Sequence, residues 1–418
     1  MVSSARVRHN LIKILNLFPG FKAFLHRYRF KLYMWNYKRE HERCTNSNES
    51  QIIIFDATKI KYASLNGHDK FKDQGKSLSG DWDLNVIEFE ALPVFRAFRE
   101  HFVGGSAWVE TEFYQSVLKE VQAGAIRWNC GNQEQLDQRF LGLDSLYEDI
   151  RDHGYKSQQD IPEKEGTIEL LYDDIGFSVG RGGELVFLDG RHRLCIAKLL
   201  NLTKVPGRVI ARHKEWQEFR EEIFAYAELN EGTVYAPLLH PDLVSIPHTH
   251  SHDRFEIIKQ SLPFSTGSLL DIGTHWGYFC HRFEEVGFDC YAVESDSVNL
   301  YFLEKLKQAG NKSFRIINQS IFDYKEKQNF DVVLALYIFH HFLKTEADYN
   351  RLVEFISHLD MKVLILGAHN MGEEQMKGSY KNYTPLEFVE FIIENSCLSN
   401  SKLLTETDDG RFLYMLTQ

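Results

Sequence analysis

The amino-acid sequence predicts an α/β protein with two main domains. The N-terminal domain is α+β, and the C-terminal domain has a mostly parallel sheet that ends in an antiparallel hairpin. From residue 253 onward, apolar strand-like runs alternate with helix-like segments, which is typical of a parallel sheet with helices on both faces. The 418 residues are enough for two or three domains with a core in each. We divide the chain into residues 1–50, 51–213, 214–252 and 253–418.

The composition restricts the class of function. Hydrophobic residues make up 43% and charged residues 26%, which is ordinary for a globular protein. The net charge of -11 counts against a general nucleic-acid binder, which should be basic. Six scattered cysteines without a Cys-x-x-Cys pair predict free thiols and no structural zinc. No apolar run reaches the roughly 18 residues of a membrane-spanning helix, and no secretion signal is evident, so we expect a cytoplasmic protein.

Residues 1–50 form a basic N-terminal segment followed by a polar linker. Up to about residue 40, lysines and arginines are interleaved with aliphatic and aromatic residues, and Pro19-Gly20 divides the run. A basic helix of this kind could bind peripherally to the anionic inner face of a membrane. We favour the other interpretation, in which the helix packs on the body of the protein with a solvated basic face.

Residues 51–213 begin with a strand at residues 52–55 and contain further strands at residues 175–179, 185–188 and 205–211. Helices are expected at residues 89–102, 110–123, 146–154 and 194–200, the third ending at Gly154. Asp81 and Asp83 flank Trp82 after Gly80. They predict either a ligand-facing loop or an Asx turn with the tryptophan in the core.

The segment Asp189-Gly190-Arg191-His192-Arg193 lies between a predicted strand and a predicted helix. It places two guanidinium groups and an imidazole beside free N–H groups at a helix N-terminus, which suits a phosphate or another anion. Alternatively, the two arginines only hold the helix to neighbouring acidic residues.

The stretches "LYEDIRDHGYKSQ" and "VGRGGELVFLDGRHRLCIAKLLNLTKVPGRV" resemble the ParB/sulfiredoxin superfamily. The resemblance implies that Asp189, Gly190, Arg191, His192 and Arg193 bind ATP or another nucleotide, with Mg²⁺, and it leaves open whether phosphate is transferred. The catalytic cysteine of sulfiredoxin is replaced by Arg191, so sulfinic-acid repair is not expected. No helix-turn-helix follows, which weakens a role in DNA partition.

Residues 214–252 are expected to form a helical connector, with a helix at residues 216–229. His248, His250 and His252 would share one face of a strand and could bind a metal ion. Because no further ligand is evident nearby, we favour a solvated linker without a metal.

The C-terminal domain opens with the strand Ser268–Ile272, a glycine turn and a helix at residues 279–286. A second strand then stops on Glu294. Glycines let a backbone approach a ligand, and the acidic residue can accept hydrogen bonds from ribose hydroxyls. The spacing is Gly-x-x-x-Gly, so it is not the dinucleotide-binding fingerprint.

Further strands are predicted at residues 314–317, 330–336 and 362–367. Further helices are predicted at residues 296–309, 352–359 and 386–394, and a final hairpin is predicted at residues 402–416. In sheets of this kind, ligands bind at the carboxyl ends of the strands.

The C-terminal domain resembles the Rossmann-like class I S-adenosylmethionine-dependent methyltransferases in "LLDIGTHWGYF", "YAVES", "NQSIFD" and "FDVVLALYIFHHF", in that order. The resemblance implies that S-adenosylmethionine is the cofactor. It assigns the methionine part to Asp271, Gly273 and Gly277, the ribose to Glu294, the adenine to Ser320, Ile321 and Asp323, and the sulfonium end to Leu336. The loop departs from the common Gly-x-Gly-x-Gly pattern because Thr274-His275-Trp276 fills its middle.

His340 and His341 follow the fourth strand of this domain, and His369-Asn370 follows the fifth. Either of the first two could be a catalytic base or shape an acceptor pocket, although we slightly favour an ordinary role at a helix start. The Asn/Asp-Pro-Pro-aromatic motif of DNA amino-methyltransferases is absent from the corresponding stretch.

The sequence therefore predicts O- or N-methyl transfer to a small-molecule or glycan acceptor, joined to a nucleotide-binding module that could be a kinase. The alternatives are a nucleotide-sensing protein with a degenerate methyltransferase domain and a DNA-associated ParB-like protein. No pattern in the sequence indicates an oligomeric state.

Overall fold

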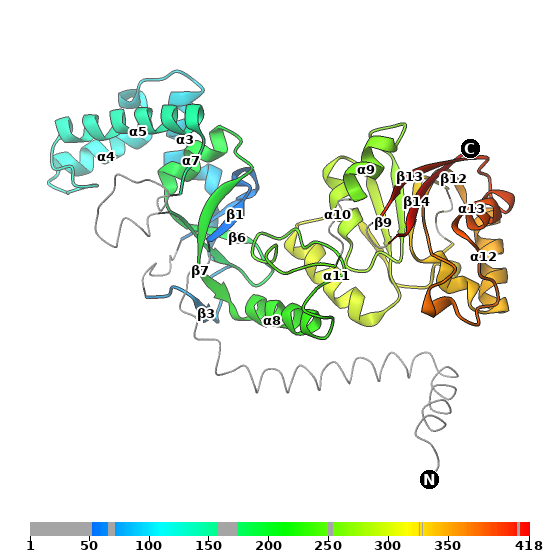
Figure 1. Cartoon of the computed structure of the whole chain (residues 1–418). Helices are drawn as coiled ribbons and strands as arrows, with labels where there is room; N and C mark the ends of the chain where they lie inside the picture. Colours follow the sequence, from blue (N-terminus) through cyan, green and yellow to red (C-terminus); the bar gives the residue numbers. More distant parts are fainter. Residues whose placement is uncertain are drawn as a thin grey trace, which may run out of the picture. The chain divides into compact units, whose positions relative to one another are not determined.

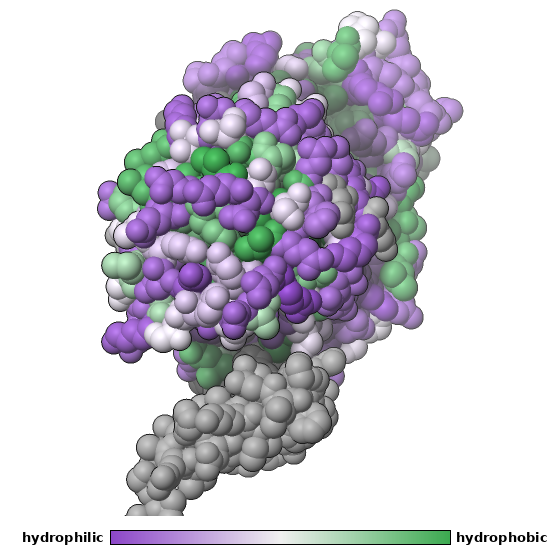
Figure 2. Space-filling model, turned by 90° about the vertical axis from the view of Figure 1, so that its right-hand side faces the viewer, coloured by the Kyte–Doolittle hydropathy of each residue, from purple (hydrophilic) through white to green (hydrophobic). Residues whose placement is uncertain are grey.

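The computed structural model describes residues 52–65, 72–157, 174–249, 254–325, 327, 329–407 and 410–418. The predictions for residues 1–50 and for His250 and His252 fall outside this part of the chain. The described residues divide into two compact units, one up to Ile223 and one from Phe224 onward (Figure 1). None of the described helices is long and apolar enough to span a bilayer. Seen from one side, the surface mixes hydrophilic and hydrophobic residues (Figure 2), as protein surfaces usually do.

The N-terminal unit is built on a mixed sheet in which the strand order is β1-β7-β5-β6-β2-β4, with β3 also paired to β7. The strands are β1 (Ile52–Phe55), β2 (Tyr62–Ser64), β3 (Lys76–Leu78), β4 (Val86–Glu88), β5 (Ile175–Val179), β6 (Leu185–Asp189) and β7 (Val205–His213). β7 pairs antiparallel with β1 and parallel with β5, and β5 pairs antiparallel with β6. This confirms the α+β class of the unit, and its likeness to the ParB/sulfiredoxin superfamily stays a prediction.

The helices of this unit are α3 (Pro93–Phe102), α4 (Glu112–Gln122), α5 (Gln133–His153) and α7 (Arg191–Leu199), and they gather on one side of the sheet (Figure 1). Their buried side chains share one core with the sheet, which includes Phe98, Phe140, Phe177 and Ile196. A further helix, α8 (Lys214–Glu228), follows β7 directly and contains the division between the two units.

The prediction for α5 was wrong at its N-terminal end, because the helix begins at Gln133 rather than near residue 146. Asn132 caps the helix by accepting a hydrogen bond from the backbone N–H of Gln135 at 2.9 Å. The first turns are mostly polar and bury only widely spaced residues such as Leu136 and Phe140, which hides the helical period. Gly154, with φ of 78°, ends the helix as predicted.

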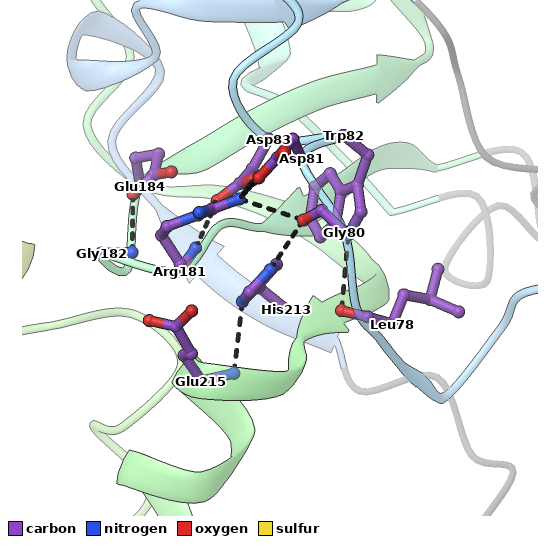
Figure 3. Close-up of polar contacts among 10 residues, drawn as sticks. All are labelled: Leu78, Gly80, Asp81, Trp82, Asp83, Arg181, Gly182, Glu184, His213 and Glu215. Atoms are coloured by element: carbon purple, nitrogen blue, oxygen red, sulfur yellow. Dashed lines mark hydrogen bonds and ion pairs between the residues drawn. The ribbon is translucent and has the colours of Figure 1, made fainter.

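The loop that contains Asp81 and Asp83 is held by Arg181, which lies in the glycine-rich turn between β5 and β6 (Figure 3). Asp83 accepts hydrogen bonds from the backbone N–H of Arg181 at 2.9 Å and from its Nε at 2.8 Å. Nη2 of Arg181 donates to Asp83 Oδ1 at 2.8 Å, to Asp81 Oδ1 at 2.8 Å and to the carbonyl of Gly80 at 3.0 Å. Both carboxylates of the loop therefore bind a guanidinium group of the protein itself.

Trp82 lies in the same loop and is half-buried against the ring of His213, with ring centroids 5.9 Å apart (Figure 3). The two nitrogens of His213 are both engaged: Nε2 lies 2.9 Å from the carbonyl of Gly80, and Nδ1 accepts the backbone N–H of Glu215 at 3.2 Å. Both ring nitrogens of His213 are thus used in holding the loop to the start of α8. The loop therefore matches neither predicted form, the ligand-facing loop or the Asx turn with its tryptophan in the core. Trp82 packs at the edge of the loop, and Arg181 binds both of its carboxylates.

The C-terminal unit has a sheet with the strand order β10-β9-β8-β11-β12-β14-β13. The strands are β8 (Ser268–Ile272), β9 (Asp289–Val293), β10 (Arg315–Ile317), β11 (Asn329–Leu336), β12 (Asp360–Ala368), β13 (Asn400–Glu406) and β14 (Phe412–Thr417). The first five strands of the order are parallel, β14 runs antiparallel to β12, and β13 forms a hairpin with β14. The predicted fold, a Rossmann-like methyltransferase sheet with a closing antiparallel hairpin, is confirmed.

Helices cover both faces of this sheet: α9 (Arg254–Ser261), α10 (Tyr278–Glu285), α11 (Ser297–Ala309), α12 (Glu346–His358) and α13 (Pro385–Glu394). Alternate residues of β11 belong to different cores, because Val332 packs with Phe283 of α10 whereas Val333 packs with Ile356 of α12. The strands are therefore apolar on both faces, which explains the continuous apolar runs in the sequence.

The strand order reverses between β8 and β11, which are parallel neighbours with Leu334 opposite Asp271. The carboxyl ends of these two strands form a switch point, where ligands bind in open α/β sheets. The four motifs identified in the sequence lie at the ends of β8, β9, β10 and β11, and His369 follows β12, so the fold brings them to one edge of the sheet.

Candidate functional site

The glycine loop between β8 and α10 requires glycine at both ends. Gly273 and Gly277 have φ of 70° and 81°, in the region that side chains disfavour. A Cβ atom on Gly277 would lie 2.5 Å from Leu303 Cδ1, and one on Gly273 would lie 2.9 Å from Ile338 Cδ1. Gly273 is exposed, so a ligand can approach it closely, although its N–H already donates to the carbonyl of Val293 at 3.0 Å.

The unusual middle of the loop is accommodated by packing Trp276 into the core. Its Nε1–H donates to Asn299 Oδ1 at 3.2 Å, and its ring lies 4.4 Å from that of Phe302 in α11. Tyr226 of α8 packs on the same indole at 4.8 Å. His275 supplies the required turn with φ of 55°. The loop therefore holds Trp276 on its inner side, facing α11.

Asp271 lies near the end of β8 and is buried beneath the loop. Thr274 Oγ1 donates to its carboxylate at 2.6 Å, and the thiol of Cys280 lies 3.8 Å from the same oxygen. Burial raises the pKa of Asp271 to about 6, and the hydrogen bonds and the charge of Arg254 partly oppose that rise. Asp271 is therefore a buried carboxyl group that ionises close to neutral pH.

Glu294 follows β9 directly and connects that strand to the glycine loop. Its Oε1 accepts the backbone N–H groups of Ser295 and Asp296, each at 2.8 Å, and its Oε2 accepts the N–H of His275 at 3.1 Å. Burial raises the pKa of Glu294, and the backbone donors act against that rise. A carboxylate accepts about four hydrogen bonds, so Oε2, which has one donor, retains capacity for a ligand hydroxyl.

The residues predicted near the adenine follow β10 in the 3₁₀ turn Ile321–Asp323. Ile321 is buried in the core, and Ser320 is half-buried. Asp323 is 63% exposed and pairs with Arg351 at 3.1 Å. Asp323 thus has a surface partner within the protein, and its role toward adenine stays a prediction.

Two buried histidines lie beyond the ends of β11 and β12. His340 is 2% exposed, and neither of its ring nitrogens makes a hydrogen bond of normal geometry with the described residues, although the side chain of Gln375 lies near enough to act on its pKa. His369, which directly follows β12, lies with its ring 5.5 Å from that of His340 and its Nε2 3.2 Å from Asn382 Oδ1. Leu336, at the end of β11, pairs with Gly367 of β12, which explains the proximity of the two rings. His341 is instead exposed and accepts a hydrogen bond from Lys344 at 3.1 Å.

Burial, followed by the nearby rings of His341 and His369, lowers the pKa of His340 to about 3. Burial also lowers the pKa of His369. Both imidazoles are therefore neutral at physiological pH. The neighbouring carboxylate, Glu373, is engaged with Arg411, whose Nη2 and Nε lie 2.8 and 3.1 Å from its two oxygens.

We expect His340→Leu to raise the free energy of unfolding of the C-terminal unit by about 1–3 kcal/mol, because it removes a buried imidazole without hydrogen bonds. Hydrogen exchange of the β11 and β12 amides in the full chain measures the change. The control is His358→Leu, at an exposed position of α12, which should change little. Faster exchange in His340→Leu would contradict the prediction.

The predicted anion site lies at the N-terminus of α7. Gly190 precedes the helix with φ of 85° and no side chain caps the end. The His192 ring stacks on Phe98 at 5.6 Å, and its Nε2 is buried without a hydrogen bond. Burial, together with the charges of Arg139, Arg191 and Arg193, lowers the pKa of His192 to about 4. Three arginines therefore lie close enough to His192 for their charges to act on it, and Asp189 is half-buried at the end of β6.

The sequence reasoning did not identify Arg139 or Arg254. Arg139 comes from α5, well before the segment at Asp189 to Arg193 in the chain, and Arg254 comes from α9, the helix that precedes β8; neither lies in a recognisable motif. Of the three alternating histidines, His248 lies within the described residues. It is half-buried, and its backbone forms an isolated parallel β-bridge with Val234. In the part of the chain that the structure describes, no three His, Cys, Asp or Glu residues cluster to hold a metal ion.

No protein-family model and no curated protein matches the chain. Among solved structures, the chain is similar to a 2.2 Å structure of WbdD at 18% identity and a TM-score of 0.37, covering 44% of each chain. Another WbdD structure, described as a bifunctional kinase-methyltransferase, matches at 18% identity and a TM-score of 0.38 over 44% of each chain. The N-methyltransferase NodS from Bradyrhizobium japonicum WM9 matches at 12% identity and a TM-score of 0.32, covering 40% of this chain and 97% of NodS. The matched region spans less than half the length of the WbdD chains.

Proposed function

We propose that the C-terminal unit is an S-adenosylmethionine-dependent methyltransferase. The observation that carries this proposal is the hydrogen bond between the His275 N–H and Glu294, which joins the glycine loop to the acidic end of β9. An open backbone and a carboxylate with spare acceptor capacity, placed together at the switch point, suit a nucleoside with free ribose hydroxyls.

The buried carboxylate of Asp271 favours this cofactor over a dinucleotide. A pyrophosphate at the start of α10 would be repelled by a negative charge beneath the loop, whereas an α-ammonium group would be attracted. The amino-acid end of S-adenosylmethionine carries such an ammonium group. When bound, the cofactor supplies a methyl group on a sulfonium centre.

The acceptor region favours transfer to oxygen. His340 and His369 are neutral, and each imidazole offers donor and acceptor capacity that matches a hydroxyl. Glu373, the carboxylate whose charge acts on both rings, is already bound to Arg411, so it is not available to a cationic amine. We propose a hydroxyl-bearing small molecule or glycan as acceptor, with a ring nitrogen of His340 as the group that would take the hydroxyl proton when the methyl group passes from sulfur to oxygen.

Calorimetry of the full chain with S-adenosylmethionine and S-adenosylhomocysteine tests the cofactor assignment. We expect one site per chain for each ligand. If neither binds, the assignment is wrong and the alternative of a degenerate methyltransferase domain gains support.

We expect the affinity for S-adenosylhomocysteine to fall on acidification, by about tenfold per pH unit below pH 6. Asp271 attracts the ligand ammonium only when ionised, and its pKa lies at about 6 with Thr274, Cys280 and Arg254 facing it. Calorimetry between pH 5 and 8 measures this dependence. Asp271→Asn should flatten the profile, and any remaining slope belongs to Glu294, whose pKa is also raised. An unchanged slope in this variant would contradict the role of Asp271.

For the N-terminal unit we propose a site for nucleotide phosphates, ATP or another nucleotide with Mg²⁺, at the start of α7. The supporting observation is the group of Arg139, Arg191 and Arg193 around His192. Phosphate transfer by this module, as by a kinase, stays a prediction from the sequence.

Arg191→Ala is expected to lower nucleotide affinity about tenfold or more, because it removes a charge-assisted hydrogen-bond donor. Thermal shifts with ATP, ADP and CTP, each with and without Mg²⁺, measure this effect. Arg151→Ala, which removes a surface arginine paired with Asp152, is the matched control. Equal shifts in both variants would argue against the site, and duplex DNA binding at physiological salt would favour the DNA-associated alternative.

A further inference from the structure

Arg254, the first residue of α9, carries a buried guanidinium group. It is only 4% exposed, and its Nη1 makes no hydrogen bond within the described residues. Its charged end lies 5.5 Å from the ring centroid of Phe279 and 5.5 Å from that of Tyr337. No described acidic group lies within ion-pair distance of it.

This arrangement is costly for the protein alone. Removing a charged group from water costs several kcal/mol unless hydrogen bonds or an opposite charge compensate, whereas contacts with aromatic faces contribute roughly 0.5–2 kcal/mol. The packing of Arg254 therefore leaves electrostatic attraction and hydrogen-bonding capacity for an anion.

The location of Arg254 indicates which anion. Phe279 lies in the first turn of α10, immediately after the glycine loop, and Tyr337 follows the last residue of β11. Asp271 lies near enough for the charge of Arg254 to influence its pKa. Through Phe279 and Tyr337, the buried cation is thus placed at the same end of the sheet as the buried Asp271, close enough for its charge to act on that carboxyl group.

We propose that Arg254 binds the α-carboxylate of the methionine part of S-adenosylmethionine, while Asp271 faces the α-ammonium group. The inference rests on the proposed function and assigns to it a residue outside every motif in the sequence. Opposite charges side by side complement a zwitterion, and they discriminate against adenosine compounds that lack the amino-acid end.

Calorimetry with S-adenosylhomocysteine and 5′-methylthioadenosine, which lacks the amino-acid end, tests this proposal on the full chain. We expect Arg254→Met to weaken S-adenosylhomocysteine binding by at least about 30-fold, because a buried charge pair with the ligand is lost. Binding of 5′-methylthioadenosine should change by less than about threefold, since it makes no contact with that charge. Arg254→Lys, which retains the charge but not the planar donor array, should give an intermediate loss.

Arg282→Met is the matched control. Arg282 also lies over a ring, that of Phe255 at 4.2 Å, but it pairs with Glu256 at 3.3 Å. This variant should bind both ligands as the wild type does. Equal weakening of both ligands in Arg254→Met, or no weakening of either, would overturn the inference alone. Failure of the wild-type chain to bind either ligand would overturn the proposed function itself.

Discussion

Replacing Asp83 with alanine is expected to destabilise the N-terminal unit by about 2–3 kcal/mol, because it removes a buried carboxylate that accepts charge-assisted hydrogen bonds from a partly exposed guanidinium group. The side chain of Asp83 is fully buried, and it accepts three hydrogen bonds from Arg181 (Figure 3). Burial alone would raise the pKa of Asp83, but the hydrogen bonds and charge of Arg181 hold it below its ordinary value. Because this pKa is depressed, the contribution is present at neutral pH and is lost only as acidification protonates the carboxylate.

Hydrogen exchange of peptides from β5, β6 and β7 in the full chain measures the loss in this unit separately from the other. Asp81→Ala provides the matched control, because Asp81 binds the same Nη2 of Arg181 but is 80% exposed. Its loss should cost less than about 1 kcal/mol. If the two substitutions lowered the stability of the unit equally, the burial of Asp83 would not be the reason for the contribution of its ion pair with Arg181.

Replacing Glu294 with alanine is expected to weaken S-adenosylhomocysteine binding about 100-fold or more, since hydrogen bonds to a charged group contribute roughly 1.5–3 kcal/mol each. The substitution removes the proposed acceptor for the ribose hydroxyls. It also removes the acceptor for the His275 N–H, which fixes the glycine loop. Both losses act on the same ligand, so the effect should exceed that of any other single change in the unit.

Calorimetry on the full chain measures this loss, with Asp289→Ala as control. Asp289 begins the same strand, β9, but it lies at the surface and pairs with Arg315. Glu294→Gln, which retains size and one carbonyl acceptor, should fall between wild type and alanine. Undiminished binding by Glu294→Ala would exclude Glu294 as the ribose ligand.

The alternation of strands and helices in the C-terminal unit could be predicted because its strands are buried on both faces and therefore appear as uninterrupted apolar runs. The loop at Gly273 and Gly277 could also be predicted, because positive φ and close packing leave glycine as the residue that fits. Local sequence carries both signals.

The remaining features depend on tertiary contacts. Asp81 and Asp83 look equivalent in the sequence, yet the fold buries only the second, through an arginine about a hundred residues away. Arg139 and Arg254 reach their sites from helices whose own sequence gives no indication of a ligand. The polar first half of α5 was missed because its stability comes from a few widely spaced core contacts.

The position of Cys280 beneath the glycine loop has a kinetic consequence. Its thiol is fully buried against Asp271 and Thr274, and burial raises its pKa well above the ordinary value. A thiol in this state reacts with an alkylating reagent only after local opening. The alkylation rate of Cys280 therefore reports how often the loop opens, and a ligand that holds the loop closed lengthens the lifetime of the free thiol.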